Sequence, residues 1–448
     1  MKNKTYLSFG EKVGYALGDA ASNLFFQTFA IFLLYYYTDI VGLPAAAVGT
    51  MFLVTRIFDT FTDPIMGAIA DRTNTRWGKF RIYLLIGAIP YGLIGFFMFI
   101  GPDFNTTGRL IYAYLTYTAM MLAYTAVNVP YSSLMGVMTP SIRERSILSS
   151  FRFIFAFLAG IIVARSFIPM KDYLGGGDEL LGVRLTMGIF GVASALMFMV
   201  TFFATRERVS PPPDQVSNLR ADVRELLRNG PWIVVSLITI VQLITIVMRE
   251  SSVIFYFKYV VGNEGGASIF LMWAKIAIIT GIVANIFIMR LVDKRTLLMA
   301  YGYLAALCYG GIYFVDPANS TLLHTLNIVG SLAFGPIGVI LWSMYGDCAD
   351  YGEWKFYRRS TALVFSSSLF AIKLGLTLGG AIPGWLLGAS GFVANEAQEA
   401  DTLGMIRLLM TLFPAGLIIL FASMVFVYRL NNRQLEQIEG DLALRKAV

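Results

Sequence analysis

Residues 231–248 read PWIVVSLITIVQLITIVM, eighteen consecutive positions without a charged side chain. As an α-helix, a run of this length extends about 27 Å, close to the roughly 30 Å thickness of the hydrocarbon core of a bilayer. Such a run is typical of a transmembrane helix. We therefore interpret the rest of the sequence with lipid as its main solvent.

The composition of the whole chain supports this interpretation. Of its 448 residues, 57% are hydrophobic and only 14% are charged, whereas about a quarter of an average globular domain is charged. These values exclude a soluble enzyme, a secreted disulfide scaffold, a disordered protein and a nucleic-acid-binding protein. Cys308 and Cys348 imply no disulfide or metal framework.

Apolar runs of about twenty residues or more, each long enough to cross the bilayer, recur twelve times. Their approximate ranges are 11–38, 45–70, 81–101, 109–138, 147–169, 181–204, 231–261, 266–290, 296–315, 320–346, 361–390 and 403–430. The sequence shows neither the alternation of an outer-membrane barrel nor a cleaved signal peptide. It predicts an all-α polytopic membrane protein with twelve transmembrane helices.

The Lys and Arg residues predict the orientation. Of 35 such residues, 24 fall on one side of the predicted helices, and basic residues gather on the cytoplasmic side. At most five fall on the other side: Arg109, Lys171, Arg184, Lys258 and Arg407. We expect both termini in the cytoplasm, and the protein in the plasma membrane, as a bacterial inner-membrane protein.

The chain divides into two predicted halves. The longest segment between runs, 205–230, contains Pro211, Pro212 and Pro213. We expect a six-helix half at 1–204, a cytoplasmic loop at 205–230, a second six-helix half at 231–430 and a cytoplasmic tail at 431–448. Short strings echo between the halves, and transporters built from such parallel repeats bind substrate near the membrane midplane.

Ionisable residues inside the runs are candidate functional sites, because a charge at mid-membrane is costly and normally has a partner. The basic ones are Arg56, Arg152, Arg165, Arg249, Lys275 and Lys373, and the acidic ones include Asp19, Asp59, Asp63 and Glu250. For Arg165, Lys275 and Glu250, which have no motif around them, we expect a structural ion pair or a position near a helix end.

Arg56, Asp59 and Asp63 lie on one helical face, being spaced i, i+3 and i+7. Two carboxylates one turn apart repel in a low dielectric, and a proton or a bound cation relieves the repulsion. The segment therefore predicts a site for Na⁺ or H⁺. The alternative is that Arg56 neutralises Asp59.

Two further runs carry polar groups. Tyr124, Thr125 and Asn128 precede Pro130, which frees a backbone carbonyl, as is tolerated where a helix lines a cavity. Lys373 stands before several glycines and is either a substrate ligand or the partner of an acid. The alternative for the first run is a kinked packing helix. His324 is the single histidine, and no phosphate loop is present, so we expect no enzymatic activity and no cofactor beyond the coupling ion.

Strings along nearly the whole chain resemble the glycoside–pentoside–hexuronide:cation symporters, a branch of the major facilitator superfamily that includes melibiose permease. They are Tyr35-Tyr-Tyr-Thr38-Asp39, Arg56-x-x-Asp59-x-x-x-Asp63-Pro64, Asp71-Arg72, Arg76-Trp-Gly78-Lys79-Phe80-Arg81, Asn128-x-Pro130-Tyr131, Arg143-Glu144-Arg145, Tyr256-Phe257-Lys258-Tyr259, Trp342, Asp350-Tyr351-Gly352-Glu353-Trp354-Lys355 and Lys373.

The resemblance implies roles for individual residues. The candidate cation ligands are Asp59, Asp63, Thr125 and Asn128, with Na⁺ as one option. The candidate substrate ligands are Asp19, Asn23, Tyr124, Asn128, Arg152, Arg249, Trp342 and Lys373. The candidate cytoplasmic gate is Asp71, Arg72, Arg76, Arg81, Arg143, Asp350, Glu353 and Arg359.

The sequence also departs from the family pattern. Asn23 and Asn128 stand where melibiose permease has sugar-binding acids, and Ser132 replaces an aromatic residue. With Arg152 and Lys373 retained, the pocket would be more positive, which suits an acidic sugar such as a hexuronide or oligouronate. If Asp19 instead pairs with Arg152, a neutral glycoside or pentoside is the better substrate.

The sequence therefore predicts a symporter, working as a monomer by alternating access, that couples Na⁺ or H⁺ to a glycoside or oligosaccharide. Of the two sugar classes, the acidic one is the preferred prediction and the neutral one is the alternative. The rival interpretations are a lysolipid transporter of related fold, a channel and, last, a membrane enzyme. Besides the sugar and the cation, we expect the lipid bilayer as a partner and no nucleic acid.

Overall fold

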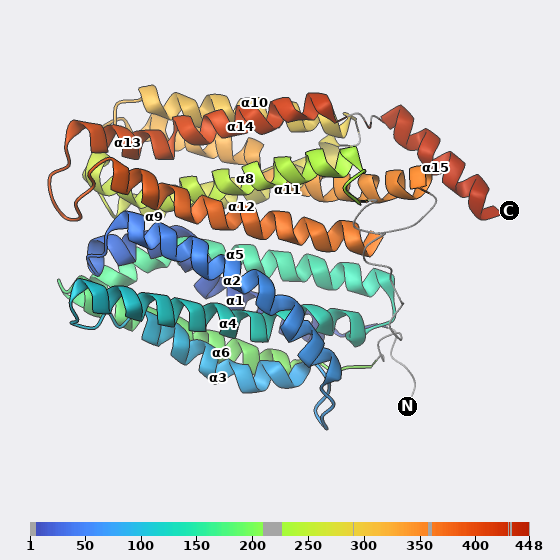
Figure 1. The fold of residues 1–448 in the computed structure, drawn as a ribbon, viewed down its shortest axis with the longest axis horizontal. Coiled ribbons are helices and arrows are strands. Elements are labelled where there is room, and N and C mark those ends of the chain that lie inside the picture. Colours follow the sequence, from blue (N-terminus) through green and yellow to red (C-terminus); the bar gives the residue numbers. More distant parts are fainter. Residues whose placement is uncertain are drawn as a thin grey trace. The chain divides into compact units, whose positions relative to one another are not determined.

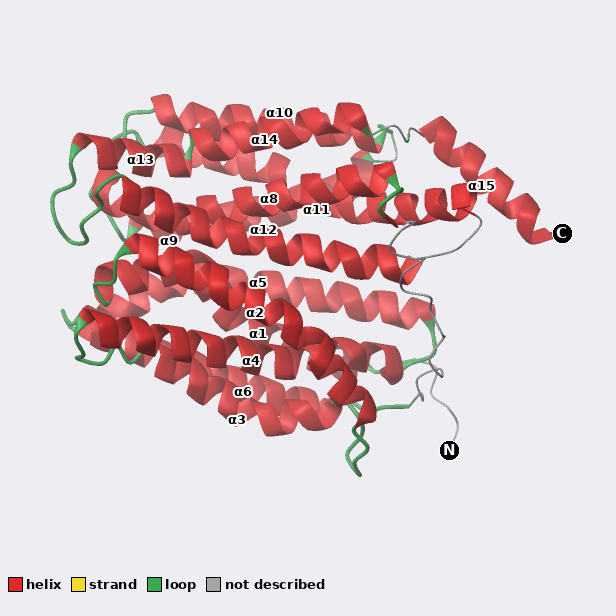
Figure 2. Cartoon of the chain, viewed as in Figure 1, coloured by secondary structure: helices red, strands yellow, loops and turns green. Residues whose placement is uncertain are grey.

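The computed structural model describes residues 6–208, 226–289, 291–356, 361–428, 430 and 432–447. Throughout these ranges the secondary structure is helical, apart from an isolated bridge between Thr75 and Gly78 in a short loop (Figure 2). The predicted all-α class is confirmed.

Most of the helices are long and close to the predicted apolar runs (Figure 1). Those of the first half are α1 (Phe9–Tyr35) with η1 (Tyr36–Ile40), α2 (Ala45–Arg72), α3 (Arg81–Met98), α4 (Thr106–Met138), α5 (Ile142–Gly175) and α6 (Glu179–Ala204). Those of the second half are α8 (Gly230–Phe255) with η2 (Tyr256–Val261), α9 (Gly266–Ile288), α10 (Lys294–Gly311) with η3 (Ile312–Phe314), α11 (Ser320–Phe356), α12 (Thr361–Ala389), α13 (Ala400–Met410), α14 (Leu412–Met424) with η4 (Val425–Val427), and α15 (Asn432–Ala447).

Among the described residues, eleven helical segments are long and apolar enough to cross a membrane. The predicted run at 45–70 corresponds to α2, which has 28 residues and is not among these eleven. The side chains at positions 60 and 61 of α2 lie outside the described residues. The twelfth span and the cytoplasmic side of both termini stay predictions.

The chain forms two compact units, which we describe separately. Unit 1 comprises residues 1–213, 265–272 and 384–397, and unit 2 comprises 214–264, 273–383 and 398–448. In unit 1, α1 packs on α5 and α6, α3 packs on α4 and α6, and α2 packs on α4. In unit 2, α10 packs on α11 and α14, and α8 packs on α14, α13 and α11. Most of the predicted central loop, 209–225, lies outside the described residues.

Side-chain caps fix several helix starts. Ser8 and Glu11 form a capping box, in which each side chain accepts a hydrogen bond from the other's backbone N–H, at 3.0 and 3.2 Å. Asn229 caps α8, where Pro231 occupies the first turn and needs no hydrogen-bond partner for its nitrogen. These polar residues mark the points where apolar runs begin.

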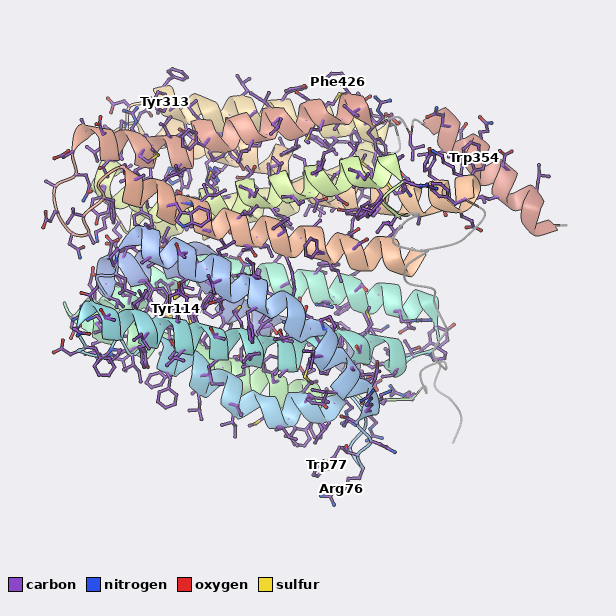
Figure 3. All side chains as sticks on the ribbon, in the orientation of Figure 1. Arg76, Trp77, Tyr114, Tyr313, Trp354 and Phe426 are labelled. Carbon is purple, nitrogen blue, oxygen red and sulfur yellow. The ribbon has the colours of Figure 1, made fainter. Side chains whose placement is uncertain are left out.

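Two features of the second half differ from the sequence-based prediction. The helix α11 continues to Phe356, ten residues beyond the predicted end of its run, so the Asp350–Lys355 string is helical. The tail forms α15, and the indole N–H of Trp354 donates to an Asp441 carboxylate oxygen at 2.8 Å. Trp354 lies beside α15 in Figure 3. The tail contains too few apolar residues to stand out as a membrane helix.

The first helix of each half ends in a π-helical turn. In the first half this is η1, with five residues, and in the second half it is η2, with six. A π-turn is wider than an α-turn and is rare in proteins. The matching positions are a structural echo between the halves that the sequence comparison did not reveal.

Candidate functional site

The paired acids of α2 meet a hydroxyl from α4. Thr125 Oγ1 lies 2.8 Å from Asp59 Oδ1 and 3.0 Å from Asp63 Oδ1. A threonine hydroxyl has a single proton, so the two carboxylates compete for it. Asp59 and Thr125 are buried, at 6% and 3% exposure, and Asp63 is half-buried. The three residues therefore place oxygen atoms from two helices around one small region.

The neighbouring Arg56 contacts aromatic side chains. Its Nε donates to the hydroxyl of Tyr117 at 3.1 Å, and its guanidinium lies 5.7 Å from the centre of the Phe26 ring. Asp59 lies within electrostatic range of this guanidinium. Arg56 thus balances part of the negative charge of Asp59 and Asp63. The carboxylate oxygens that contact Thr125 keep that contact.

A ladder of polar side chains runs along α1. Asn23 Nδ2 donates to the backbone oxygen of Asp19 at 2.9 Å and lies 3.5 Å from its carboxylate. One turn further on, Gln27 Nε2 donates to Asn23 Oδ1 at 3.4 Å. We name these three residues the α1 ladder. Their spacing of four residues keeps them on one face of the helix.

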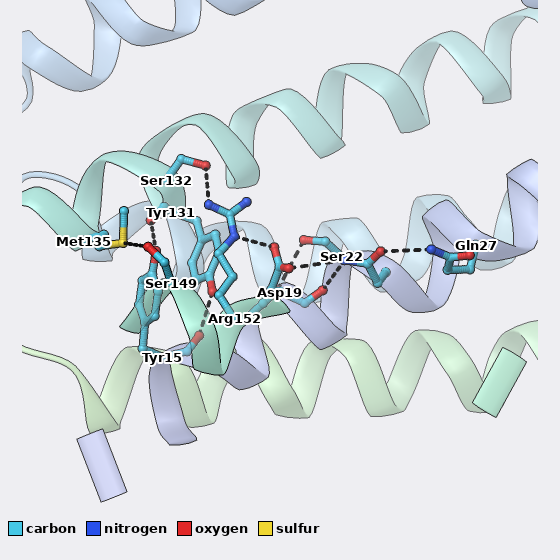
Figure 4. A network of polar contacts seen from close by, with 11 residues as sticks. Tyr15, Asp19, Ser22, Gln27, Tyr131, Ser132, Met135, Ser149 and Arg152 are labelled. Atoms are coloured by element: carbon cyan, nitrogen blue, oxygen red, sulfur yellow. Dashed lines mark hydrogen bonds and ion pairs between the residues drawn. The ribbon is translucent and has the colours of Figure 1, made fainter. Parts of the chain in front are cut away.

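Arg152, on α5, joins the α1 ladder at Asp19. Its Nε donates to Asp19 Oδ1 at 2.9 Å, and its Nη1 lies 3.4 Å from Ser132 Oγ on α4. The guanidinium also lies 5.2 Å from the centre of the Tyr131 ring. Figure 4 shows Arg152 between these partners. Arg152 thereby connects α1, α4 and α5 through groups that also suit a sugar.

Two tyrosines, Tyr15 on α1 and Tyr131 on α4, connect the two helices next to the Asp19–Arg152 ion pair. The hydroxyl of Tyr131 donates to the backbone oxygen of Tyr15 at 2.8 Å, and that of Tyr15 lies 3.4 Å from the backbone oxygen of Tyr131. Their rings stack with centres 4.6 Å apart. Pro130, the residue before Tyr131, is buried at this point of α4. The reciprocal arrangement ties α1 to α4 next to Arg152.

Tyr124 lies between the sugar candidates and the cation candidates. Its ring stacks on Phe26 with centres 6.0 Å apart. Asp19, Arg152, Arg56 and Asp59 all lie within electrostatic range of it. Asn128, one turn further on, is half-buried and makes no hydrogen bond to another described side chain. The structure therefore brings three of the predicted ligands of the first half, Asp19, Arg152 and Asp59, close to Tyr124.

The candidates of the second half are described within unit 2. Arg249 is 5% exposed, its Nη2 donates to Asn327 Oδ1 at 2.6 Å, and its guanidinium lies 3.8 Å from the centre of the Tyr309 ring. Trp342 is 40% exposed on α11, and Lys373 is half-buried on α12. Arg249 thus packs among side chains of its own unit.

Glu250 and Lys275 form a salt bridge between α8 and α9. Their side chains are 11% and 9% exposed. This agrees with the expectation of a structural ion pair for these two residues, which have no motif around them.

Three of the described gate residues, Asp71, Arg76 and Arg81, make contacts inside unit 1. Lys79 Nζ lies 3.3 Å from Asp71, and Arg81 donates to the backbone oxygen of Phe202 at 2.6 Å. Arg76 lies over Trp77 at the exposed tip of the loop after α2 (Figure 3). Arg72 is exposed at the end of α2, and Asp350 and Glu353 lie half-buried on α11. The side chain of Arg143, and Arg359, lie outside the described residues.

Sequence reasoning missed some organising residues. Glu207 accepts three hydrogen bonds at the start of α3, from the backbone N–H groups of Lys79, Phe80 and Arg81, at 2.8, 2.7 and 2.9 Å. Gln27 was also missed, although its spacing from Asn23 is a visible signal. Nothing in the spacing of Glu207 indicates its partners, since they lie more than 120 positions away in the sequence.

Comparison with known proteins identifies the family. The family described as "MFS/sugar transport protein" matches residues 14–432. The chain belongs to this family. It is 35% identical to the inner membrane symporter YicJ of Escherichia coli, over 98% of this chain and 96% of that one. This confirms the resemblance to the glycoside–pentoside–hexuronide:cation symporters.

Other relatives of this transporter have related names. An isoprimeverose transporter of Lactiplantibacillus pentosus is 33% identical over 91% of this chain and 85% of that one. A glucuronide carrier protein homolog of Escherichia coli is 32% identical over 99% and 97% of the two chains. Members of this family are multi-pass transporters and not enzymes, so the predicted class and membrane location are confirmed.

The fold of this transporter also matches a solved structure. A bacterial homolog of the human lysosomal transporter Spinster superposes with a TM-score of 0.69, covering 94% of this chain and 97% of that one, at 16% sequence identity. At this identity the likeness establishes the fold alone.

Proposed function

We propose that this transporter is a symporter that couples a cation, Na⁺ or H⁺, to the uptake of a neutral glycoside. The observation that carries the proposal is the single Thr125 hydroxyl within 3.0 Å of both Asp59 and Asp63. Two carboxylates that share one donor proton gain from a positive charge placed between them. Cation binding would therefore be strongly favoured at this point of α2.

The chemistry of the three residues fits either cation. Na⁺ takes the oxygen ligands that two carboxylates and a hydroxyl offer, as hard cations do. A proton would instead bind one carboxylate, which then donates a hydrogen bond to the other. Both events neutralise one negative charge, and both change the field at Tyr124. Through Tyr124 the occupied cation site would support sugar binding at the α1 ladder, and coupling of this kind is reciprocal.

The choice of a neutral sugar rests on Arg152. Its ion pair with Asp19, at 2.9 Å, balances its charge within the pocket. A sugar carboxylate would compete with Asp19 for this guanidinium, and displacing Asp19 would leave a buried carboxylate without its ion-pair partner. A neutral glycoside instead finds donors and acceptors on Asn23, Gln27 and Ser132. Hydroxyl groups of a sugar bind such amides and hydroxyls without a change in net charge.

The remaining parts of the proposal follow from the fold class. Transporters built from two repeats expose a midplane site to each side in turn as the repeats rock. We assign this alternating access to a single chain, with the predicted gate residues holding the cytoplasmic side closed in one state.

A transport assay in reconstituted vesicles tests the coupling. Wild-type protein should accumulate a radiolabelled methyl glycoside when an inward Na⁺ or proton gradient is imposed, and the effective gradient identifies the ion. Asp63→Asn should abolish accumulation. Asp103→Asn, which changes an exposed acid in a loop, is the matched control. Normal accumulation by Asp63→Asn would contradict the coupling assignment.

Thermal unfolding of purified protein tests the substrate class. A ligand that binds the folded state raises the unfolding temperature. Neutral methyl glycosides should raise it and the corresponding uronates should not. Stabilisation by uronates alone would show that Arg152 exchanges Asp19 for a sugar carboxylate, and the acidic-sugar hypothesis would then replace ours.

A further inference from the structure

An apolar hollow lies on the surface of unit 1 between α3 and α6. Its volume is about 780 Å³, within the roughly 300–1,000 Å³ typical of small-molecule sites. The two helices pack directly on each other and lie side by side in Figure 1. Ile89, Leu93 and Val192 form part of its walls and are 53%, 50% and 62% exposed. In a membrane these side chains face lipid.

Glycines create the hollow. A Cβ atom on Gly92 would lie 2.6 Å from the backbone oxygen of Gly191, and one on Gly191 would lie 2.8 Å from that of Gly92. The two backbones therefore touch, as small residues allow in membrane helices. Gly188 and Ala195 extend this floor along α6. Because large side chains are absent here, a surface groove remains between the apolar walls. We call it the α3–α6 groove.

Arg184 lies at one end of the α3–α6 groove, close to the start of α6. Its Nε donates to the backbone oxygen of Ile100 at 2.5 Å, and its Nη2 lies 3.3 Å from that of Gly101. These bonds fix the guanidinium at the mouth of the groove. Its Nη1 has no hydrogen-bond partner among the described residues, so its two N–H donors remain for a ligand.

The length of the groove matches one leaflet of a bilayer. From Arg184 to Leu196 an α-helix rises about 18 Å, and half of the hydrocarbon core is about 15 Å. A groove with a positive charge at one end and an apolar floor along the rest is complementary to a phospholipid. The lipid has its phosphate at the membrane interface and its acyl chains in the hydrocarbon core. Guanidinium groups bind phosphate oxygens strongly because donor geometry and charge both fit.

We propose that the α3–α6 groove binds one phospholipid. One acyl chain lies on Gly188 and Gly191, and the phosphate accepts hydrogen bonds from Arg184 Nη1. The site is separate from the residues assigned to sugar and cation, and it belongs to the described part of unit 1 alone.

Binding of lipid to the purified protein tests the proposal. Protein stripped of lipid in detergent is titrated with dioleoyl phosphatidylglycerol and, separately, with dioleoylglycerol, which has the same chains but no phosphate. Native mass spectrometry should show one tightly bound phosphatidylglycerol per chain, and dioleoylglycerol should bind at least about tenfold more weakly, as expected for a lost charge-assisted contact. Equal binding of the two would overturn the phosphate assignment.

Variants then locate the site. A Cβ on Gly188 would make only ordinary contacts, 3.4 and 3.5 Å from the Phe96 ring, so Gly188→Leu introduces no clash at its Cβ and adds side-chain volume to the groove. The control is Gly416→Leu on α14, where a Cβ meets no atom within 4 Å. Gly188→Leu should remove the tight phosphatidylglycerol, and Gly416→Leu should retain it.

Arg184→Gln should weaken phosphatidylglycerol binding about tenfold and leave dioleoylglycerol binding unchanged. Tight phosphatidylglycerol binding in Gly188→Leu would show that the lipid binds elsewhere. A protein dimer that Gly188→Leu disrupts would show that a second copy of the chain, and not a lipid, occupies the groove. Either result would overturn the proposal.

Discussion

Two ion pairs, one in each unit, hold their charges in different ways. In unit 1, Arg152 pairs with Asp19 but keeps 27% of its side chain exposed, and neutral amides and hydroxyls surround the pair. In unit 2, Lys275 and Glu250 pair with only 9% and 11% of their side chains exposed. A charge with exposed surface and alternative hydrogen-bond partners can exchange ligands, whereas an enclosed pair cannot do so without a large desolvation cost. The contrast teaches that burial and neighbours, more than the presence of a charge, separate ligand-binding residues from structural ones.

The largest effect is expected from breaking the enclosed pair. Lys275→Ala leaves the Glu250 carboxylate buried without its ion-pair partner, which costs about 3–5 kcal/mol of stability. The measurement is the unfolding temperature of the purified protein, which should fall by many degrees, together with the yield of folded protein in the membrane.

The double variant Glu250→Leu/Lys275→Met is the control for this prediction. Replacing both charges by apolar residues of similar size should restore most of the stability, because such replacements are often neutral. Glycoside transport should return with it. A stable double variant without transport would show that the pair takes part in function, and the contrast between the units would then fail.

An intermediate effect is expected at Arg152. Arg152→Ala should weaken glycoside binding about tenfold to a hundredfold, the range for hydrogen bonds to a charged group. Its unfolding temperature should fall less than that of Lys275→Ala, since Asp19 keeps Asn23 nearby. Calorimetric titration with the glycoside gives the first quantity and thermal unfolding the second. An equal loss of stability in the two variants would mean that both pairs are structural.

The smallest effect is expected within the α1 ladder. Asn23→Ala removes a neutral hydrogen-bonding group and should weaken glycoside binding by about two- to tenfold. The matched control is Ser22→Ala, because the Ser22 hydroxyl bonds only within its own helix, to the oxygen of Gly18 at 3.3 Å. Equal glycoside affinity in Asn23→Ala and the wild type would remove the ladder from the sugar site.

Much of the fold could be predicted from the sequence, because apolar length is a local property. Eleven of the twelve predicted runs correspond to one helix or to one helix with a short continuation, and the last, 403–430, corresponds to two consecutive helices, α13 and α14, with η4. The exceptions have local causes. Asp350–Lys355 contains too many charges to belong to an apolar run, yet α11 continues through it, and α15 is too polar to resemble a membrane helix.

The site could be predicted in part. The common face of Asp59 and Asp63 followed from their spacing, and Thr125 was a candidate from the resemblance; the structure places its hydroxyl within 3.0 Å of both carboxylates. The pairing of Asp19 with Arg152 was one of two alternatives in the sequence, because the partners are 133 positions apart. Three-dimensional contacts of this kind, like those of Glu207, depend on how whole helices pack and leave no periodic pattern.

The π-helical turn at the end of α1 sets the direction, around the helix axis, in which the next connection leaves the helix. Relative to an α-helix, such a turn holds one additional residue, and one residue of an α-helix corresponds to about 100° of rotation. Deleting one position from Tyr36–Ile40 would therefore turn the next connection by that angle and move the Asp39 carbonyl, which accepts a hydrogen bond from Asn395 at 2.6 Å. The matching turn η2 gives the second half the same dependence. In both halves, the direction in which the chain leaves the first helix therefore depends on the number of residues in the π-helical turn. It does not depend on the chemistry of any one side chain.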